Sequence, residues 1–273
     1  MERRIDIRCL QRNIAATLHY APFDRTDRTV RLPLVVFCHD FASNRIGEHR
    51  LYVKAARAFA EEGCAALRFD YAGCGESEGE YGESGLEDWI EQTRLVLDYV
   101  LDLDFIDLQR VTLLGHGLGG AVALLTAARD KRVKTLALWA PSGHPFPDVV
   151  GIVGKAAYEE AVTAGVAEYA GYRLRRTFFE SLARLQPFQE ARAFEGDVLL
   201  VHGAADSAMS VEYSFLYQKV FRTRSAGSCD KEIYTQADHS FSTKGHSDLA
   251  IRRTTEWLRE LGQQKREWYG WII

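Results

Sequence analysis

The sequence predicts an α/β fold with a mainly parallel central sheet and helices on both of its faces. From about residue 32 onward, apolar runs of the kind found in strands buried on both faces alternate with stretches of helical periodicity. This alternation favours parallel strands joined by right-handed crossovers. Glycine-rich and polar segments follow the apolar runs directly. Because ligands bind such sheets at the carboxyl ends of the strands, a site is expected at that edge.

The individual elements follow from the same periodicities. Strands are expected at residues 3–10 and 13–20, which form an opening hairpin, and at residues 32–39, 64–69, 111–114, 133–139, 198–201 and 231–234. Helices are expected at residues 51–62, 86–103 and 118–129. The first of these helices is rich in alanine and leucine and is followed by Gly63, which is suited to a C-terminal cap.

The regular alternation stops after residue 142, which predicts an insertion. We expect one α/β core formed by residues 1–142 and 191–273, with a helical insertion at residues 143–190. Aromatic residues are frequent in the insertion and include Tyr158, Tyr169, Tyr172, Phe178, Phe179 and Phe188. These rings could pack into a small core of their own or cover a substrate pocket, and the two roles are compatible. We expect the insertion to act as a lid.

Composition excludes several classes of partner. The chain has 273 residues, is 47% hydrophobic, and has a formal net charge of -4 without a large basic block, so nucleic acid is not an expected partner. No apolar run approaches the ~18 residues of a membrane span, and no signal peptide is recognised, so a cytoplasmic protein with no membrane partner is expected. The five cysteines are odd in number and lack C-x-x-C spacing. They are expected to be reduced core residues, with no metal site.

The hexapeptide Gly115-His116-Gly117-Leu118-Gly119-Gly120 follows the apolar run at 111–114. With serine in place of Gly117 it would be the G-x-S-x-G nucleophile elbow, a sharp strand-to-helix turn that raises one side-chain oxygen above the sheet. The elbow residue has a strained backbone with positive φ, which glycine tolerates. The sequence therefore predicts the turn without its nucleophile.

Two further residues complete the pattern. Asp206 lies just beyond the strand expected at 198–201, and His239 lies beyond the strand expected at 231–234. The order of nucleophile position, acid and histidine along the chain is that of the α/β-hydrolases. We therefore predict that Gly117, Asp206 and His239 occupy the three catalytic positions.

Together with the elbow and the Asp206 and His239 segments, residues 39–44 (HDFASN), 68–79 (RFDYAGCGESEG) and Pro187-Phe188 carry a resemblance to a known family. The chain resembles the serine carboxylesterases of the α/β-hydrolase superfamily that include bacterial cinnamoyl and feruloyl esterases. The resemblance implies an α/β-hydrolase fold and an oxyanion hole formed by the N–H groups of Phe41 and Leu118. It also implies a small-molecule ester substrate and no cofactor. Asp40 departs from the family pattern, which has glycine there. It could alter the turn or add a negative charge near the oxyanion, which would hinder hydrolysis, but we favour its interpretation as a solvated loop carboxylate.

With serine at 117, His239 would remove the hydroxyl proton, Asp206 would orient the imidazole, and an acyl-enzyme would form. With Gly117 no atom is available to attack, so near-inactivity is expected. The aromatic insertion favours a bulky or aromatic ester. Lactone cleavage and acyl transfer on the same scaffold remain open, as does a natural non-catalytic ligand-binding role. A laboratory substitution is the favoured explanation of the glycine, because Asp206 and His239 are retained.

Three residues are expected to contact the substrate: His116, Ser142 and Tyr172. The apolar tail at residues 268–273 is expected to dock on its own domain or to meet a second copy in a homodimer.

Overall fold

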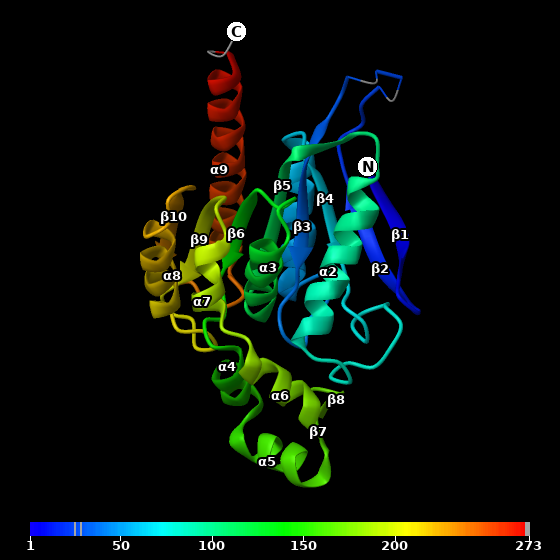
Figure 1. Cartoon of the computed structure of the whole chain (residues 1–273), viewed down its shortest axis with the longest axis vertical. Helices are drawn as coiled ribbons and strands as arrows, with labels where there is room; N and C mark the ends of the chain where they lie inside the picture. Colours follow the sequence, from blue (N-terminus) through cyan, green and yellow to red (C-terminus); the bar gives the residue numbers. More distant parts are fainter. Residues whose placement is uncertain (25, 28, 271–273) are drawn as a thin grey trace.

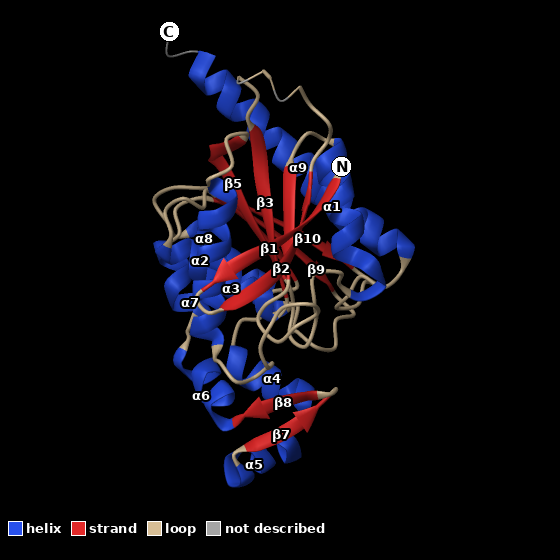
Figure 2. Ribbon diagram, turned by 90° about the vertical axis from the view of Figure 1, so that its right-hand side faces the viewer, coloured by secondary structure: helices blue, strands red, loops and turns tan. Residues whose placement is uncertain are grey.

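The computed structural model describes residues 1–24, 26, 27 and 29–270, with side-chain surroundings up to residue 264. Within that part of the chain, the central sheet has eight strands in the order β1-β2-β4-β3-β5-β6-β9-β10. β1 and β2 form an antiparallel hairpin, β2 pairs antiparallel with β4, and all other neighbours are parallel. The predicted fold class and opening hairpin are thus confirmed. Parallel strands bring their carboxyl ends to one edge, where the loops gather beneath the sheet in Figure 2.

The strands of the central sheet are β1 Glu2–Cys9, β2 Arg12–His19, β3 Leu32–Cys38, β4 Ala65–Phe69, β5 Ile106–His116, β6 Thr135–Trp139, β9 Asp197–Gly203 and β10 Cys229–Tyr234. They match the expected strands to within two residues at each end, except that β5 begins five residues earlier. Polar residues at 107, 109 and 110 interrupt the apolar run there. Backbone pairing with β3, shifted by an irregularity between Leu32 and Leu34, nevertheless extends the strand.

The described helices are α1 Leu51–Glu61, α2 Leu86–Leu101, α3 Leu118–Arg129, α4 Pro145–Val153, α5 Lys155–Ala164, α6 Arg176–Arg184, α7 Pro187–Glu190, α8 Glu212–Arg222 and α9 Lys244–Gly270, with short 3₁₀ turns at Glu48–Arg50 and Ala191–Ala193. Helices α1 and α9 cover one face of the sheet, and α2, α3 and α8 cover the other (Figures 1 and 2). Helices α8 and α9 were not predicted from the sequence. Residues 271–273 of the predicted docking tail lie outside the described residues, as do the side chains of 265–270.

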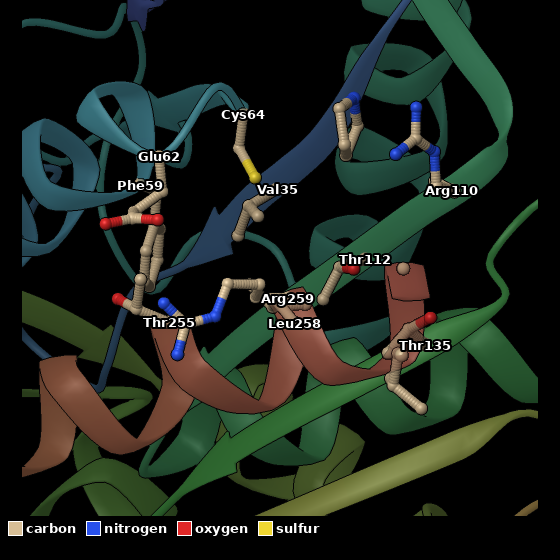
Figure 3. A pocket seen from close by; sticks show the side chains of 13 residues that line it. Val35, Phe59, Glu62, Cys64, Arg110, Thr112, Thr135, Thr255, Leu258 and Arg259 are labelled. Atoms are coloured by element: carbon tan, nitrogen blue, oxygen red, sulfur yellow. The ribbon is translucent and has the colours of Figure 1, made fainter. Parts of the chain in front are cut away.

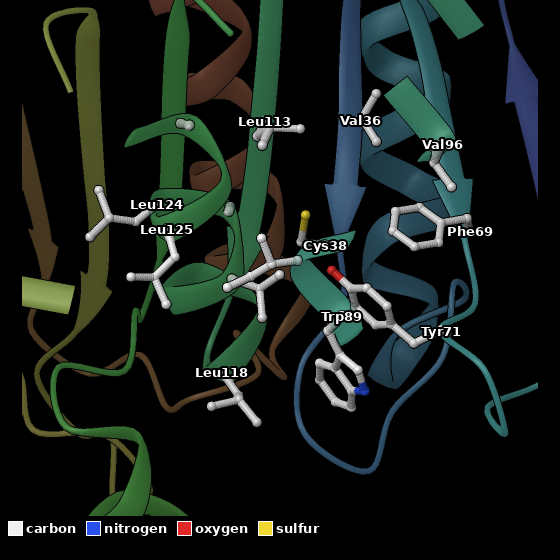
Figure 4. Packing of buried hydrophobic residues seen from close by; sticks show 14 of the residues in the cluster. Val36, Cys38, Phe69, Tyr71, Trp89, Val96, Leu113, Leu118, Leu124 and Leu125 are labelled. Carbon is white, nitrogen blue, oxygen red and sulfur yellow. The ribbon is translucent and has the colours of Figure 1, made fainter. Parts of the chain in front are cut away.

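Each face of the sheet has its own hydrophobic core. The core beneath α2 and α3 contains Tyr71 and Trp89, whose rings stack with centroids 4.5 Å apart, beside Leu118 at the start of α3 (Figure 4). Full burial of rings of this size stabilises the fold by roughly 1.5–3 kcal/mol each. This core therefore fixes the sheet edge from which the site is built. Four of the five cysteines are buried, Cys229 is half-buried, and all five are free thiols, as predicted.

The insertion is not wholly helical. Between α5 and α6 it contains an antiparallel hairpin, β7 Val166–Tyr169 and β8 Tyr172–Arg175, which corrects the expectation of a helical segment. The turn residues Ala170 and Gly171 both have positive φ, which lets the chain reverse within two residues. Figure 1 shows the insertion as a separate lobe at the carboxyl edge of the sheet. No described helix is both long enough and apolar enough to span a bilayer.

Candidate active site

The turn between β5 and α3 has the geometry of a nucleophile elbow. Gly117 has φ 53° and ψ -122°, a conformation that a residue with a Cβ adopts only under strain, so the predicted positive φ is confirmed. The approach of neighbouring backbone is also close, because a Cβ on Gly119 would lie 2.2 Å from the carbonyl oxygens of Cys38 and His39. Gly117 bonds to the neighbouring strand through Trp139, whose carbonyl accepts its N–H at 3.0 Å.

The structure brings Asp206 and His239 together. Asp206 follows β9 and His239 follows β10, and Nδ1 of the histidine lies 2.7 Å from Oδ2 of the carboxylate. Nε2 of His202 lies 3.1 Å from the same oxygen of Asp206. The N–H groups of Ala208 and Met209 each donate to Oδ1 of Asp206 at 2.8 Å. His202 was not singled out in the sequence. It is fully buried and fixes the carboxylate that faces His239.

Asp40 lies in the site rather than in solvent, which corrects its interpretation as a solvated loop carboxylate. Its Oδ1 accepts the Leu118 N–H at 2.7 Å, and its Oδ2 lies 2.8 Å from Nε2 of His239. A Cβ built on Gly117 would lie 1.9 Å from Oδ1 of Asp40. The carboxylate thus fills the space that an elbow side chain would need, because glycine leaves it open and two donors converge there.

Charge organises these three side chains. Burial lowers the pKa of His239, but the charge of Asp40 and the hydrogen bonds to Asp206 and Asp40 outweigh burial and raise that pKa to about 10. Burial raises the pKa of Asp40, yet the nearby His239 charge holds it below its usual range. The pKa of Asp206 also falls, because hydrogen bonds from His202 and His239 outweigh its burial. At neutral pH an imidazolium therefore lies between two carboxylates.

His116 supports His239 from the side. Burial lowers the pKa of His116 to about 4, so its ring is neutral. Its Nε2 donates to the His239 carbonyl oxygen at 2.8 Å, and its Nδ1 accepts the Tyr52 hydroxyl at 2.8 Å. The two imidazole rings stack with centroids 4.7 Å apart. These contacts hold the backbone and ring of His239, a different role from the predicted contact with substrate.

A cavity of about 240 Å³ opens beside the paired carboxylate and imidazolium. Its walls come from the segment after β3, from the start of α1 and from Ser240, and they include Asp40, Tyr52, His116 and His239. Among the described residues that line it, none comes from the insertion at 143–190. The structure thus brings His116 to the cavity wall but gives the insertion no part in that wall.

The other two expected substrate contacts are placed differently. Ser142 is fully buried, and its hydroxyl donates to Oδ2 of Asp148 at 2.6 Å, so it is part of a structural contact and not of the cavity wall. The Tyr172 ring packs against Tyr81 with centroids 4.5 Å apart. Neither residue lines the cavity. The insertion aromatics have a similar packing role, because Phe178 is fully buried and stacks against Phe41.

A second cavity, of about 170 Å³, lies at the opposite end of the sheet. It is lined by Cys64 just before β4, by Thr135 at the start of β6 and by Val35 and Thr112 at the same level of β3 and β5, with Arg259 of α9 at its side (Figure 3). Because the predicted catalytic positions lie at the carboxyl ends, this cavity is separate from the candidate site. In the described part of the chain, no group of three or more His, Cys, Asp or Glu residues is arranged to hold a metal ion.

The strand order, the elbow and the placement of Asp206 and His239 define an α/β-hydrolase fold. Solved structures agree with this assignment. Est1E from Butyrivibrio proteoclasticus, determined with bound ferulic acid, superposes with a TM-score of 0.81 at 23% identity, over 94% of this chain and 98% of that one. Alpha/beta hydrolase domain-containing protein 10 from mouse superposes with a TM-score of 0.72 at 21% identity, over 96% and 99%. At this identity the likeness establishes the fold.

Residues 32–167 match the family model described as serine aminopeptidase, S33. An uncharacterised 31.7 kDa protein of Escherichia coli, from the traX-finO intergenic region, is 37% identical over 107 residues. That match covers 39% of this chain and 36% of the relative. The quorum-quenching protein AidA of Acinetobacter baumannii is 36% identical over 129 residues, covering 45% of this chain and 39% of the relative. The matches thus span little more than a third of these curated relatives.

Proposed function

We propose that the chain is an esterase-type hydrolase that acts on small esters through His239, Asp206 and the Leu118 N–H. One observation carries the proposal: Nε2 of His239 and the Leu118 N–H both contact the Asp40 carboxylate next to Gly117, the first at Oδ2 and the second at Oδ1. Acyl transfer needs a proton-transfer group and an anion-stabilising donor directed at neighbouring atoms of one carbonyl centre. The family match and the α/β-hydrolase fold support the same reaction class.

The site favours small esters over bulky aromatic ones. The expectation of a bulky substrate depended on the insertion aromatics, and Phe178 and Phe179 are buried among other rings. The cavity next to His239 is about 240 Å³, which is below the roughly 300–1,000 Å³ of typical ligand pockets. Phe41 remains a proposed second oxyanion donor through its N–H. Acyl-enzyme formation on residue 117 is not possible with glycine, so we expect turnover well below that of a serine esterase.

Steady-state hydrolysis of 4-nitrophenyl acetate tests this function. We expect slow hydrolysis that falls at least tenfold in His239→Gln and in Asp206→Asn, since both changes remove the group that transfers the proton or orients it. Asp238→Asn is the matched control, because Asp238 neighbours His239 in sequence but bonds to Ser242. Equal rates in the parent chain, in all three variants and in buffer would contradict the proposal.

A second candidate is a ligand-binding protein without turnover. The observation that favours it is that Asp40 already satisfies both His239 and the Leu118 N–H, as a bound anion would. In that case an ester would bind without being consumed, and His239→Gln would change its affinity. Calorimetric titration with a non-hydrolysable ether analogue, run beside the ester assay, separates the two functions.

A further inference from the structure

Two residues depart from the esterase pattern, Gly117 and Asp40, and the side chains expected at these two positions would compete for the same space. Serine is absent at Gly117, and an acid stands at residue 40, where the family has glycine. In the folded chain a Cβ at Gly117 would overlap Oδ1 of Asp40 at 1.9 Å, so the carboxylate needs the glycine. The two positions are 77 residues apart in sequence. This mutual fit indicates an exchange of one reactive side chain for another, and it gives a reason for the glycine other than a laboratory substitution.

The Asp40 carboxylate has the partners that a nucleophile in this fold requires. Its Oδ2 lies 2.8 Å from Nε2 of His239, the nitrogen that faces the elbow position. The Asp40 and His239 side chains are each 15% exposed, so the ion pair borders the cavity without being sealed from it. Carboxylates serve as covalent nucleophiles in other enzyme classes. This one is ionised and in contact with a proton donor.

We infer that Asp40 is the nucleophile of this site, an inference that rests on the proposed hydrolase function. Oδ2 of Asp40 attacks the acyl carbon, and the bond from that carbon to the leaving group breaks. The leaving group takes the proton of His239 Nε2 and departs neutral. The products of this step are the freed alcohol or thiol, a mixed anhydride on Asp40 and a neutral imidazole.

Water then regenerates the carboxylate. The neutral His239 removes one proton from a water molecule, whose oxygen attacks Cγ of Asp40. The bond from Cγ to the bridging oxygen breaks, the acid leaves as its carboxylate, and the second water proton passes to solvent. The site returns to the Asp40 carboxylate and the His239 imidazolium. The cycle needs no reactant besides the ester and water.

The position of Oδ1 determines which carbon the water attacks. Oδ1 accepts the Leu118 N–H at 2.7 Å in the resting site. When water adds to Cγ, the negative charge develops on that same oxygen, which is already bonded to the donor. The oxyanion hole therefore stabilises hydrolysis of the anhydride at Asp40. The acyl oxygen of the substrate does not have this donor.

The same geometry specifies the substrate class. A carboxylate is a much weaker base than an alkoxide, so an adduct with an ordinary alkyl ester expels the carboxylate again. Collapse in the forward direction requires a weakly basic leaving group, which His239 then protonates. The expected substrates are small esters of phenols or enols and small thioesters. We expect kcat/KM for 4-nitrophenyl acetate to exceed that for ethyl acetate at least 1000-fold.

A single turnover in ¹⁸O-labelled water tests the inference. With the enzyme in excess over 4-nitrophenyl acetate, the acetate released should contain no ¹⁸O, and the label should be in the peptide that contains Asp40. The peptide that contains Asp206 is the internal control and should stay unlabelled. His239-dependent hydrolysis with ¹⁸O in the acetate and none in Asp40 would overturn the nucleophile while leaving the proposed function intact. Absence of any His239-dependent hydrolysis would overturn both.

Substitutions at Asp40 distinguish a nucleophilic carboxylate from one that only blocks the oxyanion hole. Asp40→Asn keeps an acceptor for the Leu118 N–H and should lower the His239-dependent rate at least 100-fold. A rate that is unchanged or raised would mean that the carboxylate only blocks the hole, which would overturn the inference. The double variant Asp40→Gly with Gly117→Ser restores the esterase pattern and serves as the positive control, because its first turnover should place ¹⁸O in the acetate. The labelling of the parent chain decides the matter even if a variant does not fold.

Discussion

Replacing Asp40 with asparagine should lower the pKa of His239 from about 10 to about 8. The imidazolium lies between two carboxylates, which raise that pKa from 6.5 to about 10 despite burial. A difference of this size corresponds to about 5 kcal/mol in favour of the charged ring, at ~1.4 kcal/mol for each pKa unit. If Asp40 supplies about half of this, its removal costs the imidazolium roughly 2–3 kcal/mol. Asparagine keeps the shape and the Leu118 contact, so the loss is one of charge.

Histidine-detected NMR titration measures this pKa directly. The parent chain should keep a charged His239 throughout neutral pH, whereas Asp40→Asn should titrate near pH 8. Asp238→Asn is the control for a charge change next to His239 in sequence, and it should leave the titration almost unmoved. A His239 pKa that is the same in the parent and in Asp40→Asn would refute the ion pair on which the reaction scheme depends.

The same ion pair makes stability depend on pH. The folded pKa of His239 is raised above its unfolded value, so its contribution is fully present below about 6.5 and is lost as pH rises through about 10. For Asp40 the folded pKa is lowered, so its contribution is present above its ordinary range and is lost on acidification. Urea unfolding across pH should therefore show a decline between pH 7 and 10 that is weaker in Asp40→Asn. A parent chain whose stability is flat over that interval would contradict the assignment of charges.

Three further changes test the packing of the site. Gly117→Ala should destabilise the chain by ~1–3 kcal/mol or more, because residue 117 has positive φ and its new Cβ would clash with Asp40. Adding Asp40→Gly should recover part of that loss. Strictly additive effects of the two changes in thermal unfolding would contradict the conclusion that Asp40 fills the space next to Gly117. Tyr52→Phe removes the donor to His116 and should cost ~1–2 kcal/mol by urea unfolding, so an unchanged midpoint would contradict that hydrogen bond. Ser142→Ala should lower stability by ~1 kcal/mol without changing KM, and a raised KM with unchanged stability would restore Ser142 as a substrate contact.

Much of the framework could be predicted from the sequence, because it depends on local patterns. Buried strands, the elbow turn and the order of Gly117, Asp206 and His239 are each encoded in short segments. The hairpin in the insertion was missed, since four-residue strands have too little periodicity to stand out among helices. The final helix, α9, was also missed, although its core residues Ala250, Ile251, Trp257, Leu258 and Leu261 have helical spacing.

The part of the site that could not be predicted concerns how distant segments meet. Asp40 was noticed as a departure, but its place depends on the space left by Gly117 across the fold. The available signal was the missing side chain at Gly117 together with the unexpected acid at Asp40. It is informative only when the two residues are considered as a pair. Tyr52 gave no such signal, because its partner His116 is brought to it only by the packing of separate elements. His202 lies only four residues before Asp206, but its spacing does not reveal that the turn after β9 returns the carboxylate to the imidazole.

The most direct test of whether Asp40 replaces the serine is the location of ¹⁸O after one turnover in labelled water. If Asp40 is the nucleophile, the label is found in the Asp40 peptide and the released acetate is unlabelled. If the label is found only in the acetate, and its release still depends on His239, the carboxylate that fills the elbow does not react with the substrate.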